Sequence, residues 1–185
     1  DLLNVDIIIS VQFHLILQKR HIEKARQIAV NLHMAPLPEY RGCNQFSFAI
    51  IDGAKEFGTT LHKLDASIDG GDLLFERRFE IKDNLFVSDL YKKTFTESKI
   101  LFVEKIQSII DGEASPIPQN KLPKERKRGF HLRKEMSQIK QISSDWSLEK
   151  QKRYFRATYF PPFTPPVMVP ESGSIKLNMD WYNSL

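Results

Sequence analysis

The apolar run Asp6-Ile-Ile-Ile-Ser-Val-Gln-Phe-His-Leu-Ile-Leu17 limits the fold of this chain more than any other feature of its sequence. The run is only about half of the roughly 20 residues that a membrane-spanning helix requires. It also contains the polar residues Gln12 and His14. We therefore predict a buried strand over residues 5–12 and no membrane span.

The residues after this strand follow the pattern of an α/β unit. A helix is predicted over residues 20–27, and a short apolar strand over 28–32. Such units form half of a doubly wound sheet, in which ligands bind beyond the carboxyl ends of the strands. The segments Gln12-Phe13-His14 and Asn31-Leu32-His33 are therefore expected to leave the sheet at one edge and to face one crevice.

Further elements are predicted from turn residues, periodicity and caps. They are a helix over 43–52 that stops at Gly53, strands over 58–64 and 72–81 joined by a turn at 68–71, and a long helix from Ser88 to Gly112. The apolar residues expected mostly on one face of the long helix are Leu90, Phe95, Phe102, Val103, Ile106, Ile109 and Ile110. The predicted fold class is α/β, with a Rossmann-like, doubly wound and mostly parallel sheet.

The composition changes after Gly112, where Pro116, Pro118 and Pro123 flank a basic run over residues 121–128. We predict a core over 1–115 and a C-terminal extension over 116–185. The extension is expected to contain a helix capped at 143–145 that ends near 156, and a β-hairpin of 167–169 and 174–179 joined by 170–173. The basic run is expected to be solvated surface.

The composition also limits the class of protein. Cys43 is the only cysteine, which excludes an internal disulfide and a cysteine-rich zinc site. No secretory signal pattern is present at the start, so we expect a cytoplasmic protein. The formal net charge of +4 is mild and suits a phosphorylated small molecule at least as well as a polynucleotide.

The chemistry of the chain is predicted to lie at Asn31 and His33. In an extended strand, residues two apart point to the same side, so both side chains can reach one reacting centre. An isolated Asn-x-His pair is more often a strand-end turn residue and a satisfied polar side chain. The pair alone therefore leaves the catalytic and the structural interpretations open.

Two longer motifs change this balance. The run Asn31-Leu-His-Met-Ala-Pro-Leu-Pro-Glu-Tyr-Arg-Gly42 resembles the signature of the folate-dependent formyltransferases, and Gly58-Thr-Thr-Leu-His-Lys-Leu-Asp65 with Ile68-Asp-Gly-Gly-Asp-Leu-Leu74 resembles its second half. The resemblance implies that His33 is the base, that Asn31 polarises the formyl oxygen, and that Asp69 positions and charges them. An Asx-turn role for Asp69, and Asp65 or Asp72 as the carboxylate, rank lower.

The same resemblance implies that 10-formyltetrahydrofolate is the formyl donor and that no metal takes part. In the family the pterin ring is held mainly by backbone groups of two loops. The matching positions here are Gln12, Phe13, His14 and Leu15 in the first loop and the stretch from Asp65 to Asp69 in the second.

The acceptor is predicted from the tail Lys152-Arg-Tyr-Phe-Arg-Ala-Thr-Tyr-Phe-Pro-Pro-Phe163. It resembles the segment after the core of short N-formyltransferases that act on dTDP-linked 4-amino or 3-amino dideoxy sugars, as in O-antigen biosynthesis. Its aromatic rings and cations suit a base and a diphosphate, although its aromatics could equally be packing residues. The substrate contacts implied are Tyr40, Arg41, Asn44, Gln45 and Tyr159.

Other members of the family are disfavoured but remain alternatives. The methionyl-tRNA enzymes carry a barrel-like C-terminal domain that residues 113–185 are too short to form. The purine-pathway enzyme and the related hydrolase tend to have Asp-x-Gly-Pro where this chain has Asp69-Gly-Gly-Asp72. A non-catalytic fragment that uses the fold for assembly is a third interpretation. We expect a homodimer through the C-terminal region, with no nucleic-acid or membrane partner.

Three departures from the family pattern are visible. Ala35 replaces a frequent Ser, and Cys43-Asn44-Gln45 replaces a segment that commonly contains Pro, which is expected to tune acceptor contacts. Family members also begin with a βαβ segment ahead of the position of Asp1. The resemblance therefore implies that this chain begins part-way into the sheet.

Overall fold

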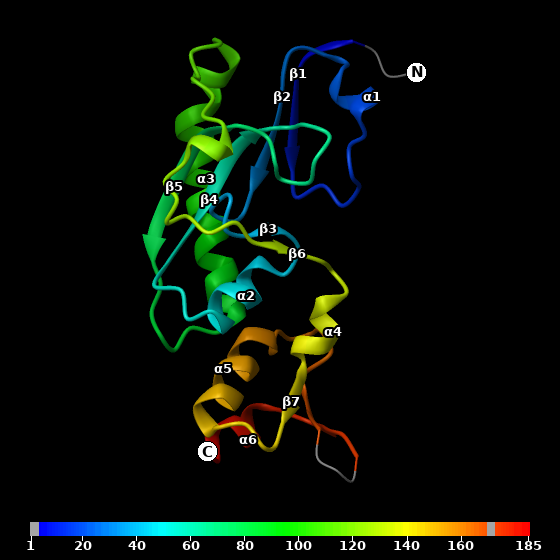
Figure 1. The fold of residues 1–185 in the computed structure, drawn as a ribbon, viewed down its shortest axis with the longest axis vertical. Helices are drawn as coiled ribbons and strands as arrows, with labels where there is room; N and C mark the ends of the chain where they lie inside the picture. Colours follow the sequence, from blue (N-terminus) through cyan, green and yellow to red (C-terminus); the bar gives the residue numbers. More distant parts are fainter. Residues whose placement is uncertain (1–3, 170–172) are drawn as a thin grey trace.

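The computed structural model describes residues 4–169 and 173–185, and its centre is a four-stranded sheet (Figure 1). The strands are β1 (Val5–Val11), β2 (Ala25–His33), β4 (Glu56–Lys63) and β5 (Leu73–Glu80), in the order β1-β2-β4-β5. The α/β class is confirmed, and β1 and β2 are parallel. The described sheet is mixed rather than mostly parallel, because β4 pairs antiparallel with both β2 and β5. The loop of residues 64–72 joins β4 to β5, and a parallel pair would need a longer crossover.

The first α/β unit is present but its boundaries differ from the prediction. Helix α1 covers only Lys19–Ile22, and β2 already begins at Ala25. The cause is pairing with the neighbouring strand, since Ala25 lies opposite Val5 and the Arg26 guanidinium pairs with Asp6 at 2.9 Å. These contacts with β1 override the local helical pattern of residues 23–27.

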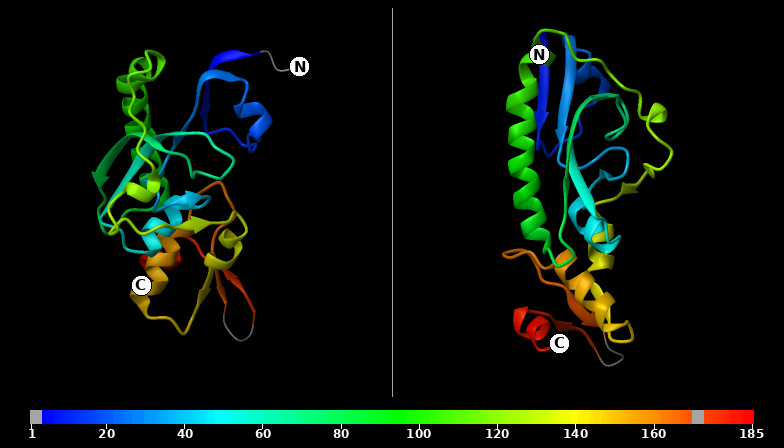
Figure 2. Two further views of the ribbon diagram at one scale, coloured as in Figure 1. Left: turned by 45° about the horizontal axis from the view of Figure 1, so that its top comes forward. Right: turned by 90° about the vertical axis from the view of Figure 1, so that its left-hand side faces the viewer.

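Helix α3 (Val87–Ile110) lies along one side of the sheet, and the segment 113–131 passes over the other side (Figure 2). Its end at Gly112 is confirmed, with φ +72° there, but its N-cap is Phe86 and not Ser88. The predicted apolar face is only partly correct, because Phe95, Val103 and Ile110 are exposed. The residues of α3 that are buried are Val87, Leu90, Thr94, Ser98, Leu101 and Ile109. The small polar residues let the helix approach β4, where the Ser98 hydroxyl donates to Thr59 Oγ1 at 2.7 Å.

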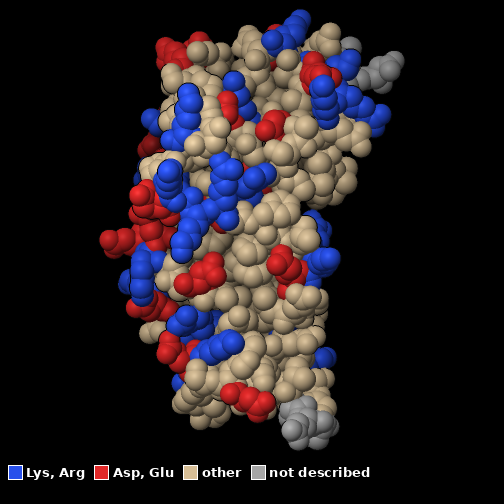
Figure 3. Space-filling model, in the orientation of Figure 1, with Lys and Arg blue, Asp and Glu red and all other residues tan. Residues whose placement is uncertain are grey.

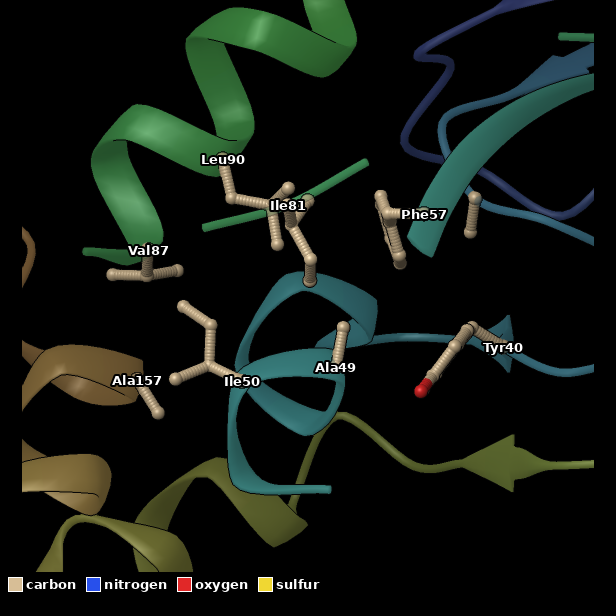
Figure 4. Packing of buried hydrophobic residues seen from close by; sticks show 9 residues of the cluster. Tyr40, Ala49, Ile50, Phe57, Ile81, Val87, Leu90 and Ala157 are labelled. Carbon is tan, nitrogen blue, oxygen red and sulfur yellow. The ribbon is translucent and has the colours of Figure 1, made fainter. Parts of the chain in front are cut away.

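Helix α2 (Gln45–Ile51) links the sheet to the C-terminal extension, within the range predicted for it. Figure 4 shows Ala49 and Ile50 of α2 packed between α3 and Ala157 of helix α5 (Leu148–Thr158). The cluster also contains Phe57 of β4 and Ile81, which directly follows β5. The extension therefore shares part of its hydrophobic core with the sheet.

The rest of the extension is a small α/β layer around Phe155 and Ile142. The predicted hairpin is confirmed as β8 (Val167–Val169) paired antiparallel with β9 (Ile175–Lys176), while most of its predicted connection lies outside the described residues. Strand β7 (Gln141–Ser143) pairs with β8, and it was not predicted. The short helices are α4 (Glu135–Ile139) and α6 (Met179–Asn183). Ser147 caps α5, so this helix begins after the cap predicted at 143–145.

The basic run 121–128 belongs to the segment that crosses the face of the molecule between the sheet and α4. This segment contains a 3-10 turn (η1, Gln119–Lys121) and ends in β6 (Phe130–His131), which pairs in parallel with β3 (Arg41–Gly42). Figure 3 shows Lys and Arg side chains gathered on this face. Arg126 is the exception to the predicted solvated run, because its side chain is 16% exposed and paired with Glu39 and Glu76.

Candidate active site

The carboxyl end of β2 and the neighbouring end of β4 bring four polar side chains together. Asn31 and His33 lie on the same side of β2, as the two-residue period predicted. In the antiparallel register Asn31 is opposite His62 of β4. The loop between β4 and β5 adds Asp69, whose Oδ1 is 3.6 Å from His33 Nδ1 and 3.6 Å from His62 Nε2. The predicted residues Asn31, His33 and Asp69 therefore form one cluster.

His33 is oriented by a backbone carbonyl. Its Nε2 lies 2.8 Å from the carbonyl oxygen of Tyr40, and a carbonyl only accepts hydrogen bonds, so Nε2 carries the proton. In the neutral ring Nδ1 is then the unprotonated nitrogen, on the side of Asp69. Burial lowers the pKa of His33 below 6.5, with the nearby His62 acting in the same direction and Asp69 opposing it. At neutral pH the ring is therefore an uncharged base.

Asp69 is held as an anion although it is buried. Burial alone would raise its pKa, but the His62 ring, the His33 ring and the backbone N–H of Gly42 lower it to about 2. The Gly42 N–H donates to Asp69 Oδ2 at 2.8 Å. Because this donor comes from a distant segment, the carboxylate does more than close an Asx turn.

The backbone around Asp69 is fixed on both sides. Asp69 has φ +50°, a conformation that few residues other than glycine adopt. The Arg41 guanidinium donates to the carbonyl of Ile68 at 3.0 and 2.7 Å. Gln119 Nε2 donates to the carbonyls of Asp69 and Gly71 at 2.8 and 2.9 Å. The strained loop is thus held by two side chains from outside it.

His62 and Gln119 are the site residues that the sequence analysis did not identify. The Nδ1–H of His62 donates to the carbonyl of Lys63 at 2.8 Å, which leaves Nε2 to accept from Asn31 Nδ2 at 3.2 Å. His62 therefore sets the orientation of the Asn31 amide. The second N–H of the Asn31 amide stays available for another acceptor. The available signal for His62 was its position two residues after Thr60, which places both side chains on the same side of β4. No local pattern marks Gln119.

The loop predicted for the folate lies beside this cluster. Val11 of β1 pairs with Leu32 of β2, so the residues after β1 leave the sheet at the same edge as His33. Phe13 is 51% and Leu15 61% exposed, which leaves apolar surface for a flat ring system to cover. This surface is compatible with the flat ring of a pterin, and the pterin contacts of the loop stay a prediction. Gln12, at φ +50°, turns the chain there, and His14 lies against Phe13 with ring centroids 5.3 Å apart.

Asp65 is occupied locally. Its Oδ1 accepts from the backbone N–H of Ser67 at 2.8 Å and from the Ser67 hydroxyl at 2.6 Å. Both partners are two residues further along the chain, as in an Asx turn. The side chain of Asp65 thus shapes the second loop, and its role toward the folate stays a prediction.

The residues predicted to contact the acceptor are dispersed. Tyr40 is buried against Phe57 in the core and reaches the site through its carbonyl only. Arg41 fixes the loop of Asp69, and Asn44, with φ 61°, donates to the carbonyl of Leu132 at 2.9 Å. Gln45 opens α2. Tyr159 is stacked on Phe155 in the C-terminal cluster, which contains none of the catalytic residues.

Within residues 4–169 and 173–185, no group of three or more His, Cys, Asp or Glu side chains is arranged to hold a metal ion. In the same ranges none of the helices has both the length and the apolar character for crossing a bilayer.

Comparison with known proteins identifies relatives with this fold. The GDP-perosamine N-formyltransferase of Brucella melitensis is 28% identical over 182 residues, which is 97% of this chain and 67% of that protein. The methionyl-tRNA formyltransferase of Clostridium novyi is 34% identical over 115 residues, but these are 62% of this chain and 37% of that protein. The chain thus spans about two thirds of the first relative and well under half of the second.

Solved structures show the same architecture. A 4-N formyltransferase from Francisella tularensis superposes with a TM-score of 0.81 at 20% identity, covering 93% of this chain and 69% of that one. A sugar 3N-formyl transferase solved with dTDP and 5-N-formyl-THF gives 0.76 at 25% identity, covering 87% and 57%. The family model for formyl transferases matches residues 1–106. The chain therefore belongs to the formyl transferase family, the family of folate-dependent N-formyltransferases that its two motifs resemble.

Proposed function

We propose that this protein transfers a formyl group from 10-formyltetrahydrofolate to the amino group of a nucleotide-linked amino sugar. The observation that carries the proposal is the cluster of Asn31, His33 and Asp69, in which a neutral imidazole nitrogen lies beside a buried carboxylate. Formyl transfer to an amine requires a base, a donor for the developing oxyanion and a group that stabilises the protonated base. The cluster supplies one side chain for each of these tasks.

His33 Nδ1 takes the proton of the attacking amine, because Nε2 is already committed to the Tyr40 carbonyl. The imidazolium that forms is stabilised by Asp69 Oδ1 at 3.6 Å, and it gives its proton to the leaving nitrogen of the donor as the bond between that nitrogen and the formyl carbon breaks. Asn31, held by His62, donates its remaining N–H to the formyl oxygen as negative charge develops there. The three side chains thus separate the roles of base, counter-charge and oxyanion donor.

The donor, 10-formyltetrahydrofolate, supplies the activated formyl group. The residues proposed to hold its pterin are the backbone groups of Gln12–Leu15 and of the loop from Asp65 to Asp69. Their support is the exposed apolar surface of Phe13 and Leu15 at the same sheet edge as His33. Solved relatives contain tetrahydrofolate or 5-N-formyl-THF, which agrees with this donor class.

A nucleotide-linked amino sugar is the acceptor that the comparisons favour. The match to GDP-perosamine N-formyltransferase extends over 97% of the chain, and another relative was solved with dTDP-3-aminofucose. The match to the methionyl-tRNA enzyme is higher in identity but covers only 62% of the chain. We propose a dTDP-linked amino-dideoxy sugar with the amine at ring position 4 or 3, and a GDP-linked sugar and methionyl-tRNA are the alternatives that the assay distinguishes.

We further propose that the protein is a homodimer that assembles through the C-terminal region. The support is the strand β9, which lies at the edge of its sheet with Ile175 62% exposed. Light scattering on the purified protein measures the molecular mass directly. A mass that stays that of one chain over a wide concentration range would contradict the dimer.

The test of the function is an acceptor comparison. The full-length protein is mixed with 10-formyltetrahydrofolate and, separately, with a dTDP-4-amino sugar, a dTDP-3-amino sugar, GDP-perosamine and charged initiator tRNA. Tetrahydrofolate release and product mass are followed. We expect a formylated dTDP-sugar and loss of turnover in His33→Asn. Turnover with GDP-perosamine alone would refute the dTDP assignment, turnover with tRNA alone would refute the sugar class, and no turnover with any acceptor would refute catalysis.

A further inference from the structure

A cavity far from the catalytic cluster is lined by residues that flank the sheet and by residues of the C-terminal extension. It has a volume of about 900 Å³. Its walls are the loop 52–55 after α2, the loop 82–86 before α3, one face of α5 and Tyr182 of α6. Lys55 directly precedes β4 and lies seven positions before His62, which is about 23 Å at 3.3 Å per residue. This cavity is therefore separate from the site of Asn31, His33 and Asp69.

One face of α5 supplies the charge of this cavity. Lys152, Arg153 and Arg156 line it together with Glu149, at the spacing of neighbours on a helix surface. Lys55 and Lys82 come from the opposite loops. The lining contains five cationic side chains and three acidic ones, with Asp52 and Asp83 as the other two acids, so positive charge exceeds negative charge by two.

The acids neutralise only part of this charge. Asp83 pairs with Lys55, and Glu149 pairs with Arg153. Among the described residues, Lys82, Lys152 and Arg156 have no ion pair with an acidic side chain within 4 Å. Three cations in one cavity thus lack an acidic partner.

Arg156 is the decisive residue. It is 9% exposed, and its Nε is a buried nitrogen without a hydrogen-bond partner in the described part of the chain. Its other nitrogens make long contacts to neutral groups, the Tyr182 hydroxyl at 3.4 Å and the Asp83 carbonyl at 3.2 Å. A buried guanidinium with no carboxylate oxygen within 4 Å is costly, since buried charges are normally paired at close range. Such a group, lining a cavity, indicates a place for an anion.

We propose that this cavity binds a phosphorylated small molecule, with the phosphate held by Arg156, Lys152 and Lys82. The excess of two positive charges matches a phosphate dianion, and guanidinium geometry suits phosphate oxygens. The volume exceeds the needs of phosphate alone, and Phe86, Leu85 and Tyr182 provide apolar and aromatic wall for the remaining part of the ligand. The cations of the tail, which the family resemblance implied for the substrate diphosphate, are here proposed to hold the phosphate of this second ligand.

Inorganic phosphate is the probe that tests this site. The full-length protein is titrated with sodium phosphate, with chloride replaced so that the ionic strength stays constant. The readouts are the Nε–H resonance of Arg156 in a nitrogen-15 NMR spectrum and the thermal midpoint. We expect a saturable shift of that resonance and a rising midpoint, and a much smaller response to acetate. Equal responses to phosphate and acetate would overturn the phosphate class.

Variants separate this cavity from general electrostatics. Lys152→Gln and Lys82→Gln each remove one unpaired cation, and each is expected to weaken phosphate binding about tenfold, the effect of one charge-assisted contact of roughly 1.4 kcal/mol. Lys92→Gln, an exposed lysine on α3 outside the cavity, is the matched control and should bind as the wild type does. Phosphate binding that is unchanged in Lys152→Gln and Lys82→Gln would overturn the proposal. Because neither variant touches Arg156, the test does not depend on Arg156→Gln folding.

Discussion

Arg126 is expected to be the residue of the basic segment whose loss most weakens the protein. Its guanidinium donates to Glu39 at 3.1 Å and to Glu76 at 2.6 Å, and it also contacts the carbonyl of Leu37. The side chains of Arg126, Glu39 and Glu76 are 16%, 17% and 19% exposed. Arg126→Gln removes the cation and leaves both carboxylates with Arg78 as their other cationic partner.

The size of the effect follows from burial and from the remaining partner. Removing one member of a buried ion pair costs about 3–5 kcal/mol, and an exposed pair contributes about 0–1 kcal/mol. These side chains are mostly buried, and Arg78 still neutralises Glu39 at 2.6 Å. We therefore expect Arg126→Gln to lower the free energy of unfolding by about 2–3 kcal/mol. For a chain of this size that corresponds to a fall in the thermal midpoint of roughly 4–12 °C.

The assay is urea unfolding of Arg126→Gln beside Arg128→Gln. Arg128 lies in the same basic run and is exposed, so its substitution removes the same charge without a buried partner. We expect its effect to stay within about 0.5 kcal/mol. A double-mutant cycle with Glu76→Gln should give a coupling energy above about 1 kcal/mol. Equal stabilities of the two arginine variants would refute the reasoning, since the burial of Arg126 would then have no energetic consequence.

Three further outcomes are expected. The pKa values of His33 and Asp69 are lower in the folded protein, so the unfolded chain binds more protons. The free energy of unfolding should therefore fall as the pH falls below 6.5, and fall again between pH 3.8 and about 2. In urea titrations, His33→Asn should lack the loss that begins at pH 6.5. Asn31→Ala should fold normally by circular dichroism and lose about 10²–10³ in kcat, and an unchanged kcat would exclude it as oxyanion donor. Gly71→Ala would place a Cβ 2.0 Å from the Lys63 carbonyl oxygen and should cost about 1–3 kcal/mol in urea unfolding, and an unchanged free energy of unfolding would contradict this close approach.

The features of the fold that were predicted correctly depend on residues close together along the chain. The two-residue period placed Asn31 and His33 on one side of β2, and the predicted stop of α3 at Gly112 is correct. The start of β2 was predicted too late, because Val5 and Asp6 of the neighbouring strand stabilise residues 25–27 as strand. Pairing between strands overrides the preference of a short segment, and a single sequence does not reveal it.

The candidate site was likewise predicted in part, because its motif residues were identified and its contacts between distant segments were not. The family motifs identified Asp69, although Asp69 reaches His33 only through a loop fixed by Arg41 and Gln119. The contact between Asn31 and His62 depends on the register of β2 against β4, which the spacing along the chain does not determine. The buried position of Arg126 was missed for a related reason. Its partners precede it by 50 and 87 residues, and a run of cations without periodicity otherwise indicates a solvated surface.

The pairing of β3 with β6 has a consequence for the order in which the enzyme is assembled during synthesis. A chain extended only to residue 115 already contains Asn31, His33 and Asp69. It does not yet contain Gln119, which fixes the loop of Asp69. It also lacks β6 and the preceding Gly129, whose carbonyl oxygen accepts from the backbone N–H of Arg41 at 3.2 Å. The catalytic loops therefore reach their final geometry only after a closure between distant segments, which is slow relative to local folding. A nascent chain should stay inactive until residue 131 has left the ribosome.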